Sequence, residues 1–212
     1  MADDLQLSAL LCARLCHDLV GPVSALSNGV EFLGDEDPEM RQQAVDLLVQ
    51  SAGQAARRLQ FFRLAFGRLD GMQVPLAEVA SAAQAFFADR RIELKWPALD
   101  AIPSEAPVHR SLKLLLNMAL LASEALVRGG RLEAEASPVS FRVLAEGPIV
   151  ELEATLRAAL ARGADEDGMA LDEVTPRAIQ PVLTARLARR VDAVLALSAP
   201  GQKPLELTAR FT

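Results

Sequence analysis

Two long helical segments joined by a short turn constrain the fold of this 212-residue chain more than any other feature. The first covers residues 5–33, and the turn GDEDPEM at 34–40 ends it and starts the second at Pro38. In the second segment, 38–66, apolar side chains recur every three or four residues, at Leu48, Ala52, Ala55, Leu59, Phe62 and Phe66. Two such helices predict a helical hairpin. Because a hairpin buries only one side of each helix, we expect two copies to form a homodimeric four-helix bundle.

The chain changes character after the stretch GRLDGMQVP at 67–75. Beyond it, short β-like runs alternate with amphipathic stretches, which predicts an α+β domain whose mainly antiparallel sheet is covered on one face by helices. The expected strands are residues 91–96, 131–136, 140–145, 192–198 and 204–211, and the expected helices are residues 76–89, 105–127, 152–162 and 176–190. We therefore expect two domains, 1–68 and 69–212, with a mobile polar connection at 162–176 inside the second.

Composition and charge exclude several classes of function. Hydrophobic residues make up 51% of the chain and aromatic residues 4%, a mixture that favours packed helices. The formal net charge of -6 provides no electrostatic attraction to nucleic acid or anionic lipid, so neither is expected as a partner. The acidic start MADDLQLSALL lacks the basic region of a signal peptide, and no run approaches the length of a membrane span. We therefore expect a cytoplasmic protein.

Cys12 and Cys16 are the only cysteines. They lie four residues apart on one expected helix, where a disulfide would cross-link almost nothing, so we interpret them as reduced apolar side chains. With His17 they would supply three ligands on one helical turn without a fourth, and we expect no metal site.

The neighbouring residues His17 and Asp18 are the first candidates for chemistry. With 100° of rotation per residue, the apolar side chains that fall within about 40° of the side opposite His17 are Leu15, Leu19, Leu26, Val30 and Leu33, with Leu11 and Val23 at the edges. The residues on its own side are mostly small or polar, namely Leu10, Arg14, Gly21, Ser24, Asn28 and Glu31. His17 is therefore expected to be accessible to another molecule.

The residues around His17 indicate how it would react. A carboxylate at Asp18 favours the imidazole tautomer with one ring nitrogen free as a nucleophile, and supports positive charge as a bond forms. Pro22 lacks an N–H and crowds the carbonyl group of Asp18, so the helix should kink or loosen one turn after the histidine, where Gly21 leaves room. These features predict a phosphoryl acceptor, and an ordinary exposed His-Asp pair is the alternative.

The stretch LCARLCHDLVGPVSALSNGVEFL, residues 11–33, resembles the H-box helix of sensor histidine kinases, in which an acid and then a proline follow the histidine. It is more similar still to the ChpT family of histidine phosphotransferases of alphaproteobacteria, and the similarity extends through the chain. The resemblance implies that the hairpin is a dimerisation and phosphotransfer domain. It also implies that the second domain is an α/β sandwich that resembles a degenerate form of the ATP-binding domain of histidine kinases.

The segments that resemble the kinase nucleotide site lack its chemistry. The helix LLLNMALLASEALVRGG, 114–130, resembles the N-box helix, but Leu121 stands four residues after Asn117, and a leucine offers no oxygen to Mg²⁺. The stretch VLAEGPIVELEATL, 143–156, has neither the aspartate nor the second glycine of the family's glycine box, so nothing cradles a triphosphate. Residues 183–211 resemble the last helix and hairpin of the kinase domain without a glycine-rich lid. We expect no ATP binding and no cofactor of the chain's own.

The resemblance thus implies a histidine phosphotransferase of a multistep phosphorelay. His17 would take a phosphoryl group from a receiver-domain phosphoaspartate of a hybrid histidine kinase and pass it to the aspartate of a response regulator, with Asp18 as supporting carboxylate. The receiver would supply Mg²⁺ and a lysine. The residues expected to contact the receiver are Leu10, Arg14, Val20, Gly21, Ser24 and Asn28. The other histidine, His109, is interpreted as a capping or surface residue.

Two alternatives remain open. An active histidine kinase with divergent ATP boxes would label itself from ATP. A non-catalytic adaptor would bind receiver domains through the degenerate domain without carrying phosphate.

Overall fold

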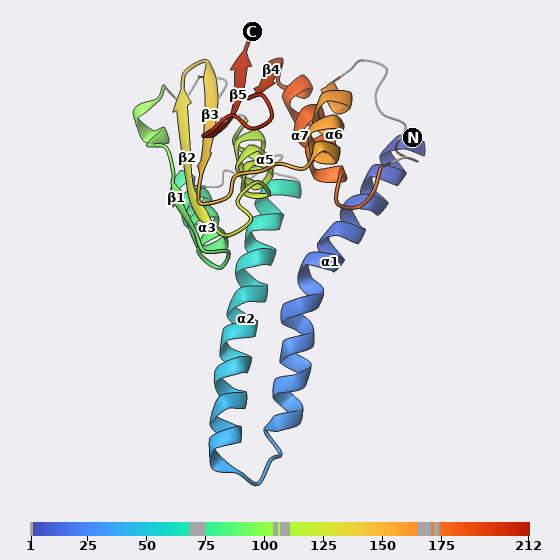
Figure 1. Ribbon diagram of the computed structural model, residues 1–212, viewed down its shortest axis with the longest axis vertical. Coiled ribbons are helices and arrows are strands. Elements are labelled where there is room, and N and C mark those ends of the chain that lie inside the picture. Colours follow the sequence, from blue (N-terminus) through green and yellow to red (C-terminus); the bar gives the residue numbers. More distant parts are fainter. Residues whose placement is uncertain (1, 68–74, 104–105, 107–110, 165–170, 172–173) are drawn as a thin grey trace.

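The computed structural model describes residues 2–67, 75–103, 106, 111–164, 171 and 174–212, and consists of a long helical hairpin and a mixed α+β unit (Figure 1). The hairpin is formed by α1 (Ala2–Phe32) and α2 (Pro38–Phe66), as the sequence predicts. α2 begins at an N-cap, because the side chain of Asp37 accepts the backbone amide of Glu39 at 2.9 Å. Lys113 stabilises the end of α2, because its Nζ donates to the backbone carbonyl oxygens of Phe66 and Gly67.

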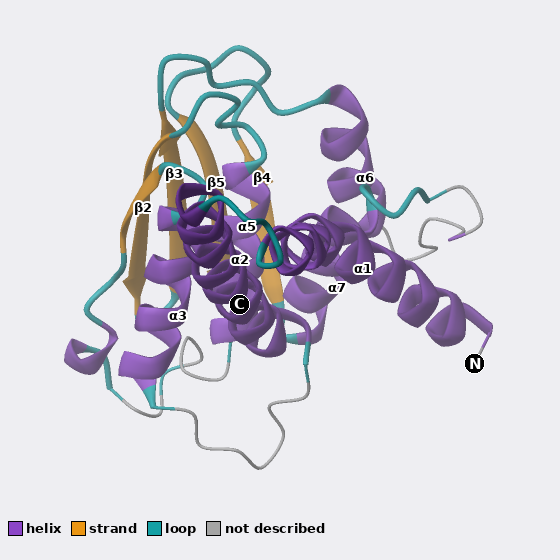
Figure 2. Cartoon of the chain, turned by 90° about the horizontal axis from the view of Figure 1, so that it is seen from below, coloured by secondary structure: helices purple, strands orange, loops and turns teal. Residues whose placement is uncertain are grey.

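The α+β unit is built from short helices packed on one sheet. Its elements are α3 (Leu76–Ala88), β1 (Ile92–Lys95), η1 (Leu99–Ala101), α5 (Leu112–Ser123), β2 (Gly130–Ser137), β3 (Ser140–Glu146), α6 (Ala154–Ala164), α7 (Ile179–Arg190), β4 (Ala193–Leu197) and β5 (Leu205–Phe211). The strand order is β1-β2-β3-β5-β4, and only the β1–β2 pair is parallel. Figure 2 shows the helices gathered on one face of the sheet. The predicted α+β class and mainly antiparallel sheet are therefore confirmed.

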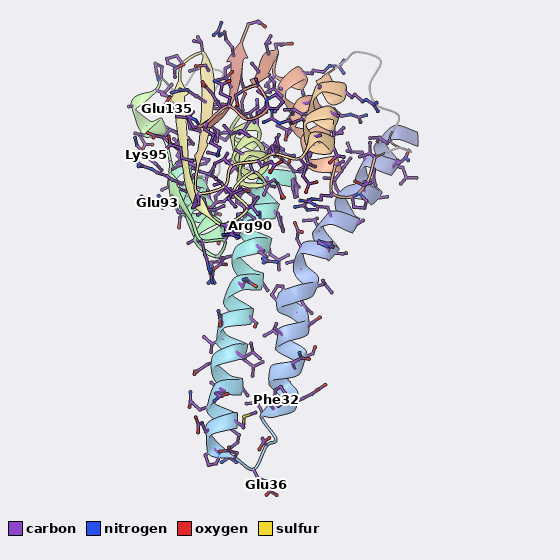
Figure 3. The ribbon with its side chains drawn as sticks, in the orientation of Figure 1. Phe32, Glu36, Arg90, Glu93, Lys95 and Glu135 are labelled. Carbon is purple, nitrogen blue, oxygen red and sulfur yellow. The ribbon has the colours of Figure 1, made fainter. Side chains whose placement is uncertain are left out.

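The two faces of the sheet differ in burial, because successive side chains along a strand point to opposite faces. Side chains such as Leu132, Phe141 and Leu207 are fully buried against the helices, in a core that also includes the end of α2. The opposite face carries charged residues, and Figure 3 shows Glu93, Lys95 and Glu135 along its outer edge. The main core of the second unit thus ties it to the hairpin.

Most element boundaries agree with the sequence within two residues, but the helix expected at 105–127 is shorter. α5 starts at Leu112 and ends at Ser123. After Ser123 the chain forms a turn, in which the amide of Ala125 donates to the carbonyl oxygen three residues before it. Leu126 then pairs with Val150 in an isolated β-bridge, so the helix cannot continue. His109, the boundary at residue 68 and much of the connection at 162–176 lie outside the described residues.

The two long helices do not pack as the helical wheel predicts. The face of α1 that meets α2 contains Pro22 and Gly29, both buried, and a Cβ added to Gly29 would lie 2.8 Å from Leu48 Cγ. The stripe expected in the core is divided: Leu15, Leu19 and Leu26 are half-buried. Val23, Val30 and Leu33, by contrast, are 51%, 60% and 40% exposed. The prediction of their burial within one chain is wrong, because a small residue at the crossing point brings α2 to a neighbouring face.

α1 continues as a helix through Pro22 and does not end there. Proline has no N–H for the carbonyl oxygen of Asp18, four residues earlier. A guanidinium N–H of Arg58, on α2, donates to that oxygen instead. The expected weakening of this turn is therefore compensated by the neighbouring helix.

One segment of α1, Leu5–Phe32, is long and apolar enough to cross a membrane by length and composition, with a mean hydropathy of 1.3. The expectation that no segment would qualify is wrong by this criterion. One such helix is a weak indication, since a buried core helix of a soluble protein and an N-terminal signal sequence meet the same criterion. Exposed valines at 20, 23 and 30 contribute to the hydropathy.

Candidate phosphotransfer site

His17 lies on the wall of a cleft of about 900 Å³ between α1 and the second unit. His17 and Asp18 line this cleft from α1, Arg90 lines it from the segment between α3 and β1, and Ser123 and Glu124 line it from the end of α5. Residues 175–177, before α7, complete the wall. The cleft therefore exists only because the hairpin and the second unit are packed together.

His17 and Asp18 differ sharply in exposure. The His17 side chain is 81% exposed, as the sequence predicts, whereas that of Asp18 is 10% exposed. Nδ1 of His17 lies 3.2 Å from Oδ1 of Asp18. A carboxylate accepts and cannot donate, so the proton belongs on Nδ1, which leaves Nε2 with a free lone pair. The exposed ring is therefore oriented as a nucleophile.

Asp18 is itself fixed by an ion-pair network that joins the hairpin to the second unit. Its Oδ2 accepts from Nε of Arg14 at 2.8 Å, and Nη2 of Arg14 donates to Glu124 Oε1 at 2.8 Å. Burial alone would lower the pKa of Arg14, but the two carboxylates outweigh burial and raise its pKa above the ordinary arginine value. The network thus holds the Asp18 carboxylate in place beside His17.

The expectation that Arg14 presents a free positive charge to a partner is wrong. Its side chain is 8% exposed, and its charge is neutralised by Asp18 and Glu124 within the chain. The helical wheel treats α1 alone, so it places Arg14 on an open surface. In the fold, the second unit covers that surface and brings Glu124, 110 residues away in sequence, to the guanidinium.

The other predicted docking residues are placed differently. Leu10 is half-buried in a small cluster formed with Ile179 and Val182 of α7, so much of its side chain is already in contact. Val20, Gly21, Ser24 and Asn28 are exposed, and a Cβ built on Gly21 meets no atom within 4 Å. The predicted open space next to the histidine is present, while the contacts proposed for it stay predictions.

The helix that resembles a kinase N-box, α5, has a structural role in the core of the second unit. Asn117 is fully buried, and its Nδ2 donates to the carbonyl oxygens of Ala65 and Lys113, each at 2.8 Å. The backbone carbonyl oxygen of Asn117 accepts from Nε2 of Gln180 at 2.7 Å. Leu121 is likewise fully buried. The single asparagine kept from the N-box pattern therefore joins α5 to α2 and α7.

The two cysteines are free, as expected, but both are exposed rather than packed as small apolar side chains. Within the part of the chain that the structure describes, no group of three or more His, Cys, Asp and Glu side chains is placed to hold a metal ion. The expectation of no metal site stays a prediction.

Arg90 is a residue of the cleft that the sequence did not single out. It is half-buried, with its guanidinium carbon 4.7 Å from the centre of the Phe86 ring and Nη1 3.5 Å from Ser123 Oγ. Desolvation lowers its pKa from the ordinary arginine value, against the attraction of Glu124 and Asp18. An arginine before a short strand has no local signature, so only the three-dimensional structure identifies it.

Comparisons of the sequence with known proteins indicate one family. A family model, the histidine phosphotransferase C-terminal domain, matches residues 76–203. The protein phosphotransferase ChpT of Brucella abortus (strain 2308) is 30% identical over 204 residues, which are 93% of this chain and 92% of that protein.

Two solved structures are similar to different degrees. One, described as a 1.7 Å structure of a bacterial phosphotransferase, is 28% identical and superposes with a TM-score of 0.79 over 97% of this chain and 96% of the other. The cytoplasmic segment of the histidine kinase QseC is 17% identical, covering 85% of this chain and 98% of the other, with a TM-score of 0.37, which supports no inference about function. Because the family model covers more than half of the chain and the ChpT relative matches nearly all of it, the chain belongs to the ChpT-type family of histidine phosphotransferases.

Proposed function

We propose that this chain relays a phosphoryl group through Nε2 of His17, from the phosphoaspartate of one receiver domain to the aspartate of another. The observation that carries the proposal is the exposed imidazole whose Nδ1 is held by a nearly buried, ion-paired carboxylate. The name of the Brucella relative, a protein phosphotransferase, supports the same activity.

The proposed step balances in atoms and charge. Nε2 of neutral His17 attacks the phosphorus of the acyl phosphate, an N–P bond forms, and the P–O bond to the receiver carboxylate breaks. The leaving carboxylate takes the electron pair, and the imidazole becomes a cation whose Nδ1–H remains hydrogen-bonded to Asp18. No proton moves, so the site needs no acid or base. The reverse step, on a second receiver, regenerates the neutral ring.

The receiver is expected to supply Mg²⁺ and its lysine at the reacting phosphoryl group, so this chain contributes position and one carboxylate. Donor and acceptor are proposed to be receiver domains of a hybrid histidine kinase and of response regulators, in the cytoplasm. ATP has no part in the proposed reaction. Two observations support that exclusion: Leu121 has no oxygen to offer a metal-bound nucleotide, and the side-chain oxygen of Asn117 is buried inside the fold.

The labelling experiment separates this proposal from both alternatives. The purified protein is incubated with [³²P]ATP alone, and separately with ³²P-labelled receiver domains from the source organism. We expect acid-labile label on the wild type only from a receiver, no label on His17→Ala, and full label on His109→Gln, which removes the other histidine. Label from ATP alone would indicate a kinase, and receiver binding without label would indicate an adaptor.

We also propose that the exposed apolar side chains of the hairpin are covered by a second copy of the chain. On α1 these include Val23 and Val30, and on α2 they include Val49, which is 70% exposed, and Leu59. Sedimentation equilibrium should show a dimer for the wild type. Val49→Asp should weaken it, whereas Val194→Asp, at a 62% exposed position on β4, should not. A monomeric wild type at micromolar concentration would contradict the proposal.

A further inference from the structure

The three arginines that line the cleft have different charge environments. The charge of Arg14 is neutralised by Asp18 and Glu124, each at 2.8 Å. Arg177 pairs with Glu153 at 2.9 Å and lies 3.9 Å from Glu124. Arg90 has no carboxylate within ion-pairing distance among the residues that the structure describes. Of these three arginines, Arg90 is therefore the one whose charge is not neutralised by a carboxylate in direct contact.

Arg90 also has unused hydrogen-bonding capacity. A guanidinium has five N–H donors, and the described contacts of Arg90 include one long hydrogen bond to Ser123 Oγ. Ser123 Oγ in turn donates to the carbonyl oxygen of Leu120 at 2.6 Å. The stacking of the guanidinium over the Phe86 ring fixes its plane while leaving its edges open. Figure 3 shows Arg90 at the end of the second unit next to the hairpin.

A half-buried cation without an ion-pair partner costs folding free energy, because it loses hydration without gaining a counter-charge. An anionic ligand would supply that counter-charge. The cleft that Arg90 faces also contains His17, which is exposed and free to bind at Nε2. A planar guanidinium matches the oxygens of a phosphoryl group in a bidentate geometry.

We propose that Arg90 is the positioning residue that binds the phosphoryl oxygens at His17. The proposal rests on the proposed function, and it adds a residue of the second unit to a site otherwise built on α1. In the phosphorylated state, Asp18 supports the charge on the imidazole ring and Arg90 neutralises the charge on the phosphoryl group. The positive charge that develops on the ring and the negative charge that the phosphoryl group carries thus each meet a fixed opposite charge.

The test uses potassium phosphoramidate, a small donor that loads histidines without a receiver domain. The rate of phosphohistidine formation on the full-length protein is followed by ³¹P NMR. Arg90→Met should slow loading about tenfold or more, in the range expected for losing charge-assisted hydrogen bonds. Arg90→Lys keeps the positive charge but loses the paired N–H donors of the planar guanidinium, so its loading rate should lie between those of Arg90→Met and the wild type. Arg91→Met removes the same charge at an exposed neighbouring position and should load as the wild type does.

Thermal unfolding separates a positioning role from a structural one. If Arg90 is kept for the phosphoryl group, Arg90→Met should unfold at the wild-type temperature or above it, because the uncompensated charge is gone and the methionine still packs on Phe86. A variant that loads slowly and also melts well below the wild type would overturn the proposal, as would loading equal to the wild type. Slow transfer from a receiver with normal loading by phosphoramidate would also overturn it, since Arg90 would then contact the partner.

The proposed function can fail independently of this inference. If receivers do not label the wild type, the relay is wrong, whatever the phosphoramidate rates are. If His17→Ala is still loaded by phosphoramidate at the wild-type rate, then another group accepts the phosphoryl group and both proposals fail.

Discussion

Two glycines of α1, eight residues apart, should respond in opposite ways to the same substitution. A Cβ added to Gly29 would lie 2.8 Å from Leu48 Cγ and 3.0 Å from Leu48 Cδ2, so the two helices must shift or Leu48 must change its rotamer. A Cβ added to Gly21 meets nothing within 4 Å, apart from its chain neighbours. Gly29→Ala and Gly21→Ala thus form a matched pair with identical chemistry.

The magnitudes follow from competing effects. Replacing glycine by alanine inside a helix stabilises it by about 1 kcal/mol. At Gly29 this is opposed by an overpacking cost of about 1–3 kcal/mol, so the net free energy of unfolding should fall by roughly 1 kcal/mol. At Gly21 the helical gain is reduced because a side chain before Pro22 disfavours the helical conformation, and the net change should be near zero. Gly29→Ala should therefore be less stable than Gly21→Ala by about 1 kcal/mol.

Urea unfolding at one fixed protein concentration measures the difference, and the concentration must be fixed because a dimer's stability depends on it. Phosphotransfer from a receiver is measured on the same samples. If a partner approaches the backbone at Gly21, then Gly21→Ala stays folded but accepts phosphate more slowly, whereas Gly29→Ala keeps its rate under conditions where it is folded. Equal or greater stability of Gly29→Ala would refute the packing described for the hairpin.

Three further changes test the charges. Arg14→Met should lower the free energy of unfolding by about 2–4 kcal/mol in urea titrations, because it leaves the nearly buried Asp18 and Glu124 without their partner. Asp18→Asn should slow loading by phosphoramidate about tenfold, because the imidazole cation loses its counter-charge, while circular dichroism still shows a folded chain. Hydrogen bonding from Lys95 lowers the pKa of Glu133, so their ion pair adds stability above the unfolded-state pKa near 4.5 that is lost as the pH falls through the lower folded value. Lys95→Met should raise the pKa of Glu133 in carboxyl ¹³C NMR and remove that acid-dependent change.

The hairpin and the sheet could be predicted because their signals are local and long. Apolar side chains repeat at helical spacing through most of 38–66, and alternating strands are separated by turn residues, so each element follows from its own sequence. The exposure of His17 was predicted for a related reason, since its neighbours on the helical wheel are small or polar. These predictions do not depend on which helices and strands contact one another in the folded chain.

The charged part of the site could not be predicted because its partners are distant in sequence. Arg14 meets Glu124, and Arg58 reaches the backbone of Asp18, only after α1, α2 and α5 have come together. One local signal was present: Arg14, Pro22 and Gly29 are spaced eight and seven residues apart, which places them on one face of α1. A buried proline and a glycine on that face indicate close packing there, and so a buried Arg14.

The contacts that join the two units favour a relay over a kinase. A domain that delivered nucleotide to His17 would have to approach the histidine and withdraw again. Here the second unit is fixed to α1 by the Arg14–Glu124 ion pair and by the packing of Leu10 on α7, and to α2 by Lys113. Each withdrawal would expose the apolar contact of Leu10 to water and break these ion-pair and hydrogen-bond contacts, at a cost in free energy. A fixed wall beside an exposed histidine instead suits a site whose moving part is the partner, which brings the phosphoryl group and takes it away.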